Sequence, residues 1–284
     1  MIVDAPMRRH KVMNMKTRMS VIVYLVLTFA GSAICYAQVF AGASLNQVAI
    51  LLMWMPGLAA MVTQLLFYRT LGGLGWRRPH WRDLAIAVAI PIAYCIIIYL
   101  PVWLTGLGRV DTGKLAQALA LAPLGVAASL LTALGEEIGW RGFLAPALYR
   151  LGGFGWASLT TGLIWGIWHL PLILSSDYNA GTPSWYAVPC FMVSVTGLSV
   201  MLARLRLHSD SLWPAALFHA THNAIIQGVF DASTIDTGPT RWITSEFGVG
   251  LTLVSIILGI YFWRRGDLPA GQDMAPIAAA PIKS

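Results

Sequence analysis

The sequence predicts an all-α protein, a polytopic membrane bundle of about eight transmembrane helices. Of the 284 residues, 57% are hydrophobic and only 11% are charged, whereas an average soluble domain has about 25% charged residues. Apolar stretches of about 20 residues, the length that a helix needs to cross a bilayer core of about 30 Å, recur along most of the chain. Together they predict one membrane domain over residues 19–263.

The positions of the apolar stretches define eight candidate spans. They cover about residues 19–42, 47–68, 83–105, 115–134, 155–174, 185–203, 212–230 and 247–263. The fourth span extends to about residue 149 if its helix continues through the polar segment that follows it. Such a continuation is expected, because it would bring the polar groups of the fourth and fifth spans to similar depths.

The charged residues indicate how the spans are oriented. With eight spans and a cytoplasmic N-terminus, every Lys and Arg except three falls on the cytoplasmic side, Arg141 included. The exceptions are Arg109, Lys114 and Arg241, and acidic residues such as Glu246 lie with them on the non-cytoplasmic side. Cytoplasmic loops carry such an excess of basic residues, so both termini are expected in the cytoplasm and the protein in the inner membrane of the cell. The net charge of +7 is not gathered on one basic and aromatic face, so nucleic acid is not an expected partner.

Two end segments flank the membrane domain. Residues 1–18 form a basic N-terminal segment that is expected to be cytoplasmic. Residues 264–284 are rich in Ala and Pro and have no helical period that could bury a face, so we expect a disordered cytoplasmic tail.

The first polar segment inside the membrane domain is LGEEIGWRGFL, residues 134–144. An ionisable side chain in a spanning helix costs about 2.5–3.5 kcal/mol on insertion scales, so it is expected to have a partner or a function. Glu137 and Arg141 are four residues apart and can form a charge-assisted pair. Glu136 points about 100° away from Glu137, and a carboxylate without a local cation is suited to act as a general base. The alternative is a helix end at which both glutamates are solvated.

Two further spans carry polar side chains in apolar surroundings. His169 lies one turn after Trp165, and its alternative role is that of a hydrogen-bonded core residue. His219 and Asn223 are four residues apart, so an imidazole and a carboxamide can converge on one point. His222 could join them or only pack, because its side chain is rotated away from Asn223.

Convergence of these three segments is the economical explanation for so many polar groups in an apolar interior. Groups this costly in hydrocarbon are stabilised by facing one another across a shared, water-filled cavity. The set suits the activation of a water molecule. A glutamate can take its proton, histidines can orient it or bind a metal ion, and an asparagine can donate to the oxyanion of a tetrahedral intermediate.

The ordered motifs resemble those of the type II CAAX prenyl protease family, also called the CPBP or Abi family of intramembrane proteases. EExxxR stands on one helix, an aromatic residue lies four before a histidine on the next, and HxxxN follows on a later one, all within a core of about residues 114–230. In this chain they are Glu136, Glu137 and Arg141, then Trp165 and His169, then His219 and Asn223.

The resemblance implies a role for each of these residues. Glu136 would activate water, while His169, His219 and Asn223 would line the catalytic site. Glu137 and Arg141 would support it, and Trp165 would form an aromatic wall where the family usually has phenylalanine.

The cofactor and the substrate stay open. Glu136, His169 and His219 could hold a divalent metal such as zinc, but the chain lacks the HExxH helix that is the strong zinc signature, which favours a metal-free reaction. The expected function is an endopeptidase that acts among membrane lipids on membrane-anchored or C-terminally lipidated proteins or peptides. A non-catalytic immunity or scaffold protein is the main alternative, and a proton-coupled transporter is the other.

Overall fold

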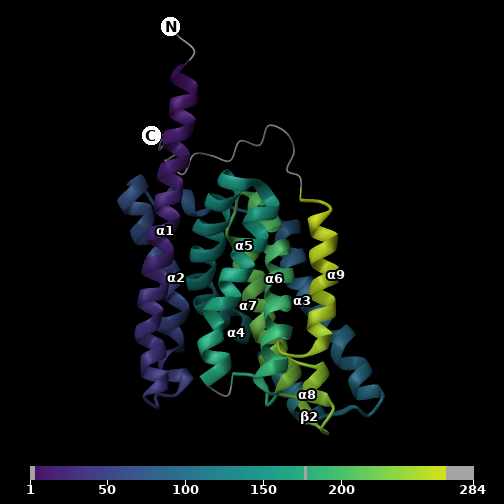
Figure 1. The fold of residues 1–284 in the computed structure, drawn as a ribbon. Coiled ribbons are helices and arrows are strands. Elements are labelled where there is room, and N and C mark those ends of the chain that lie inside the picture. The colour runs from purple at the N-terminus through teal and green to yellow at the C-terminus, as the bar shows by residue number, and fades with distance from the viewer. Residues whose placement is uncertain (1–3, 176–177, 267–284) are drawn as a thin grey trace.

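The computed structural model describes residues 4–175 and 178–266, with side chains from residue 14 onward. The long helices lie side by side in one bundle (Figure 1). They are α1 (Asp4–Phe40), α2 (Leu45–Tyr68), α3 (Trp81–Leu104), α4 (Thr112–Glu137), α5 (Ala145–Ser175), α6 (Ser184–Ser209), α7 (Trp213–Ile225) and α9 (Val249–Trp263). Within these described ranges, five helical stretches are long and apolar enough to cross a membrane, and α9 is a shorter apolar helix. The predicted all-α membrane bundle of about eight helices is confirmed.

The fourth predicted span is longer than its apolar stretch. α4 begins at Thr112, and Asp111 before it is the N-cap, whose carboxylate accepts a hydrogen bond from the backbone N–H of Lys114 over 3.0 Å. It continues through the π-helix η2 (Ile138–Leu144) into α5, as the sequence led us to expect. The direction changes at Gly153, whose φ of 78° lies in the left-handed region that glycine adopts without strain. Arg141, which the sequence places among the cytoplasmic charges, is fully buried in this continuous helix.

α2 and α4 cross at two glycines, and this crossing positions the glutamate pair. A Cβ atom on Gly57 would lie 2.5 Å from the carbonyl oxygen of Gly135, and a Cβ atom on Gly135 would lie 2.8 Å from the carbonyl oxygen of Met53. Small residues let the backbones of membrane helices approach this closely. Because Glu136 follows Gly135 directly, it is held at the interface between the two helices.

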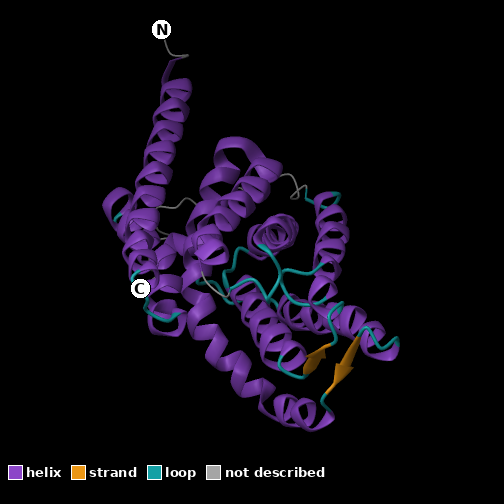
Figure 2. Cartoon of the chain, turned by 60° about the horizontal axis from the view of Figure 1, so that its bottom comes forward, coloured by secondary structure: helices purple, strands orange, loops and turns teal. Residues whose placement is uncertain are grey.

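The short elements between the helices were not predicted from the sequence. β1 (Gly108–Val110) pairs antiparallel with β2 (Thr234–Asp236), at the edge of the bundle seen in Figure 2. A 3₁₀ turn, η1 (Gly72–Leu74), follows α2, the π-helix η3 (Ile226–Asp231) extends α7, and α8 (Thr240–Ile243) precedes α9. Most of the tail predicted to be disordered, residues 267–284, lies outside the described residues.

Candidate active site

The helix that carries the adjacent glutamates remains helical through and beyond them. α4 ends at Glu137 and passes into η2 without an interruption. Single π-turns inside α-helices occur frequently at functional sites. Every residue from 135 to 148 is buried, and Glu136 and Glu137 are only 1% and 0% exposed. The alternative of a solvated helix end is therefore excluded.

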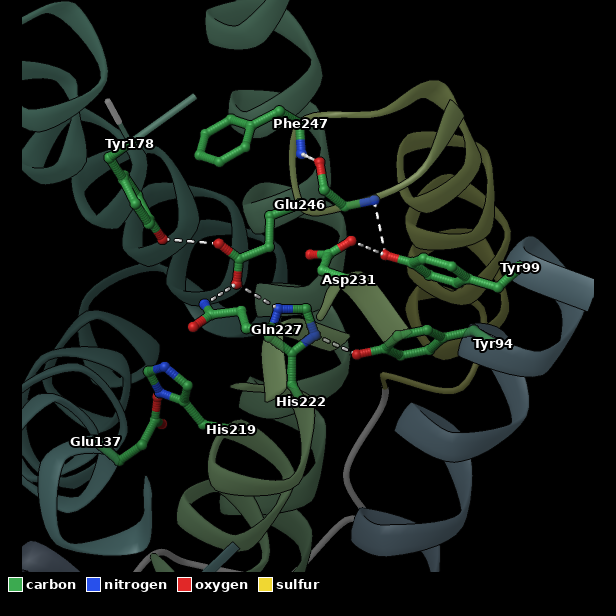
Figure 3. Close-up of polar contacts among 11 residues, drawn as sticks. Tyr94, Tyr99, Glu137, Tyr178, His219, His222, Gln227, Asp231, Glu246 and Phe247 are labelled. Atoms are coloured by element: carbon green, nitrogen blue, oxygen red, sulfur yellow. Dashed lines mark hydrogen bonds and ion pairs between the residues drawn. The ribbon is translucent and has the colours of Figure 1, made fainter. Parts of the chain in front are cut away.

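Glu137 binds two nitrogen groups through one oxygen. Nη1 of Arg141 donates to Oε1 of Glu137 over 2.8 Å. Nδ1 of His219 lies 2.9 Å from the same oxygen, and Figure 3 shows the two side chains facing each other. The guanidinium of Arg141 also lies 4.2 Å above the ring of Trp165, a cation–π contact. Because Glu137 and Arg141 are fully buried, water screens their attraction little, and Glu137 holds the imidazole from α7 against α4.

Glu136 has a different set of partners. The indole N–H of Trp165 donates to its Oε2 over 2.7 Å, and that of Trp140 donates to the same oxygen over 3.3 Å. None of the ion pairs formed by the described residues includes Glu136. The sequence suggested only an aromatic wall for Trp165, and the donor was missed. A phenylalanine at this position would have no N–H group to offer.

The two histidines each use one ring nitrogen to hold their orientation. Nδ1 of His169 lies 2.9 Å from the backbone carbonyl oxygen of Trp165, and Nδ1 of His219 faces the Glu137 carboxylate. Both partners only accept hydrogen bonds, so these contacts assign the proton of each neutral ring to Nδ1. Nε2 is then the lone-pair nitrogen of each ring, free to accept a hydrogen bond from water.

One cavity of about 270 Å³ joins the polar residues that the motifs singled out. Glu136 from α4, His169 from α5, and His219 and Asn223 from α7 all line it, together with apolar side chains of α2. Since one water molecule occupies about 30 Å³ of the liquid, the cavity has room for several. Three separate helices thus bring a carboxylate, two imidazoles and a carboxamide to one cavity that can hold several water molecules.

The donor set for a metal ion is incomplete in this arrangement. Across the part of the chain that the structure describes, no group of three or more His, Cys, Asp or Glu side chains is arranged to hold a metal ion. Glu136, His169 and His219 line the same cavity but do not form such a group. The steps proposed below therefore use the chain's own residues.

A second buried polar cluster lies beside the cavity and was not anticipated from the sequence (Figure 3). Oε1 of Glu246 accepts a hydrogen bond from Nε2 of Gln227 over 2.9 Å and lies 2.9 Å from Nε2 of His222. Its Oε2 accepts a hydrogen bond from the hydroxyl of Tyr178 over 2.8 Å. Nδ1 of His222 forms a hydrogen bond with the hydroxyl of Tyr94. The role left open for His222 is thus membership of this cluster.

Glu246, which the sequence places with the charges of the non-cytoplasmic side, is also buried. It is only 6% exposed, because the segment after α8 turns back into the bundle. Burial by itself raises the pKa of this carboxyl. The hydrogen bond and charge of His222, with the hydrogen bonds from Tyr178 and Gln227, outweigh burial and lower the pKa to about 2. The sequence offers one signal, an acidic residue directly before an apolar span.

Comparison with known proteins places the motif-bearing segment in a family context. Residues 118–225 match the model of the family described as type II CAAX prenyl endopeptidase Rce1-like. The chain is also 32% identical over 120 residues to CAAX prenyl protease 2 of Methanococcus maripaludis, an alignment that covers 38% of this chain and 43% of that protein. The alignment thus spans less than half of the relative. Glu136, His169, His219 and Asn223 all lie within residues 118–225, whereas Gln227 and Glu246 lie beyond them.

Proposed function

Because residues 118–225 match the model of the Rce1-like family of type II CAAX prenyl endopeptidases, we propose that this integral membrane protein is an endopeptidase that uses a glutamate-activated water. The observation that carries the proposal is the single cavity lined by Glu136, His169, His219 and Asn223. Groups that are this costly to bury in a membrane are kept where they have a function. Together they supply the base, the water-orienting groups and the oxyanion donor that peptide hydrolysis requires.

In the proposed reaction Glu136 takes a proton from a cavity water as that water attacks the carbonyl carbon of the scissile peptide bond. The second hydrogen of the water is donated to Nε2 of His169 or to Nε2 of His219, and this hydrogen bond orients the water. The carboxamide of Asn223 donates to the oxyanion of the tetrahedral intermediate. The C–N bond then breaks and Glu136 returns the proton to the leaving amine, so the products are a new carboxyl group and a new amine.

The neighbouring residues hold these groups in place. Trp140 and Trp165 fix Oε2 of Glu136 through their indole N–H groups. Glu137, paired with Arg141, orients the imidazole of His219 so that its Nε2 faces the reacting water. Such positioning contributes to the rate of hydrolysis, because misplacing a catalytic group by about 1 Å can lower that rate about 100-fold.

The substrates we propose are membrane-anchored or C-terminally lipidated proteins or peptides. The relative from Methanococcus maripaludis is named a CAAX prenyl protease, and a C-terminal CAAX sequence is the signal for prenylation of its cysteine. We further propose that the protein lies in the inner membrane with both termini in the cytoplasm, on the asymmetry of its basic residues.

The test in cells is a comparison of protein termini in membranes that contain either the wild type or Glu136→Gln. We expect a set of new termini that is present with the wild type and absent with the variant. Folding of the variant is checked by its abundance in the membrane and its elution as the same species in detergent. Identical termini in the two membranes would refute the proposal.

A further inference from the structure

Gln227 lies where two hollows of the protein meet. It lines the cavity that contains Glu136, and it also lines a groove of about 700 Å³ between α4 and the α7–η3 segment. Asn223 is the other residue that lines both. Gln227 is exposed, so a molecule that extends from the cavity into the groove passes its side chain.

The orientation of the Gln227 amide is set by its partner. A carboxylate only accepts hydrogen bonds, so the contact of 2.9 Å between Glu246 Oε1 and the amide must come from Nε2 of Gln227. The carbonyl oxygen of Gln227 then points away from Glu246, as Figure 3 shows. A free glutamine amide could turn either its NH₂ group or its carbonyl oxygen toward a neighbour, but Gln227 presents its carbonyl oxygen, a hydrogen-bond acceptor.

Glu246 fixes a second wall residue by the same means. It accepts the hydroxyl hydrogen bond of Tyr178, which also lines the cavity. The ring of Tyr178 stacks on that of His169, with the centroids 6.2 Å apart and the planes 23° apart. The buried carboxylate of Glu246 therefore holds two side chains. One is Gln227, whose carbonyl oxygen is an acceptor beside the groove, and the other is Tyr178, whose ring packs against the predicted catalytic His169.

We propose that Gln227 is a substrate-contacting residue and that Glu246 is the positioning residue that holds its amide. The inference rests on the proposed function and names the form of the substrate, an extended peptide segment. An extended backbone has N–H groups without partners, and in a membrane each of these must be satisfied by the protein. The carbonyl oxygen of Gln227 accepts one of them, next to the Asn223 carboxamide that serves the scissile bond.

The first experiment measures kcat and KM for Gln227→Ala on purified full-length protein. The probe is a farnesylated peptide that ends in a CAAX sequence and carries a fluorophore and a quencher. We expect KM to rise about 2- to 10-fold, the effect of one lost hydrogen bond, while kcat changes less than about 2-fold. The matched control is Gln38→Ala, because Gln38 is exposed and lines neither hollow.

The second experiment asks whether Glu246 acts through Gln227. Glu246→Gln keeps the shape of the side chain but removes its charge and one of its two acceptor oxygens, so it weakens the hold on the Gln227 amide with less risk to folding than Glu246→Ala. We expect it to raise KM in the wild type, and to raise KM less when Gln227→Ala is already present, because the amide to be positioned is gone.

The outcomes separate the inference from the function on which it rests. If the wild type cleaves the probe and Gln227→Ala has the kinetics of the Gln38→Ala control, the inference is refuted and the function stands. If Glu246→Gln raises KM equally in the wild type and in Gln227→Ala, the positioning role of Glu246 alone is refuted. If the wild type does not cleave the probe at all, the proposed activity on CAAX peptides fails and the inference fails with it.

Discussion

Replacing Glu137 by Gln would test whether the two adjacent glutamates have separate tasks. Oε1 of Glu137 accepts hydrogen bonds from both Arg141 and His219, and neither Glu137 nor Arg141 is exposed to solvent. The substituted amide would keep the shape and one acceptor oxygen but lose the charge. The buried guanidinium would then lose the negative charge of its ion pair but keep its contact with the face of Trp165.

The expected loss of stability follows from that environment. Removing one partner of a buried ion pair costs about 3–5 kcal/mol, because the remaining charge is left uncompensated. Because the amide retains one acceptor oxygen, we expect Glu137→Gln to lose stability near the lower end of this range, about 3 kcal/mol. Glu136→Gln is the matched control, since it makes the same change one residue earlier on a carboxylate that has no ion pair in the described structure. It is expected to change stability by less than about 1 kcal/mol.

The assay is unfolding by SDS in mixed micelles, followed by the fluorescence of the 12 tryptophans. The account predicts that Glu137→Gln unfolds at clearly lower SDS than the wild type, and that Glu136→Gln unfolds close to the wild type. Equal losses for the two variants would refute the division of the pair into a structural and a chemical carboxylate.

Three other predictions concern the site and the cluster beside it. Trp165→Phe removes the N–H donor to Glu136 and keeps an aromatic ring, so kcat is expected to fall about 3- to 10-fold, and an unchanged kcat would show that the hydrogen bond has no effect on rate. Glu246 has a pKa lowered to about 2 from its usual 4.5, so its charge stabilises the fold above about pH 4.5, and this contribution of about 3 kcal/mol is lost as the pH falls toward 2. Acid unfolding of Glu246→Gln should lack this loss of stability. An acid transition identical to that of the wild type would contradict the lowered pKa of Glu246. Elemental analysis of the purified protein is expected to give less than one zinc per chain, and one equivalent that disappears in His169→Ala or His219→Ala would identify these residues as ligands.

The helices were predictable from the sequence because the bilayer imposes a simple requirement. A span needs about 20 apolar residues, and the apolar stretches of the sequence fall on the helices of the bundle, of which five helical stretches in the described ranges reach spanning length. The same cost of burying ionisable groups singled out His169 and His219, which the structure brings to one cavity with Glu136 and Asn223. Both the helices and these residues could be predicted because composition and helical spacing are contained in a linear sequence.

The remaining features depend on contacts that the linear sequence does not specify. Nothing in the spacing around Glu136 and Glu137 separates a π-helix from an α-helix, since the two differ only in which carbonyl each N–H meets. The Trp165 indole N–H could be assigned to Glu136 only when α4 and α5 were placed side by side. The burial of Glu246 was not predicted, because position along the chain does not reveal that a connecting segment turns back into the bundle.

Cleavage of a defined peptide by the purified protein tests the central claim most directly. The protein is reconstituted in liposomes with the farnesylated peptide in isotope-labelled water, and the products are analysed by mass spectrometry. The account predicts that the wild type yields a shortened peptide whose new carboxyl group carries oxygen from the labelled water, and that Glu136→Gln lowers this rate at least 100-fold, in the range of about 10²–10⁴ expected for a general base. Cleavage by Glu136→Gln at the wild-type rate would contradict it.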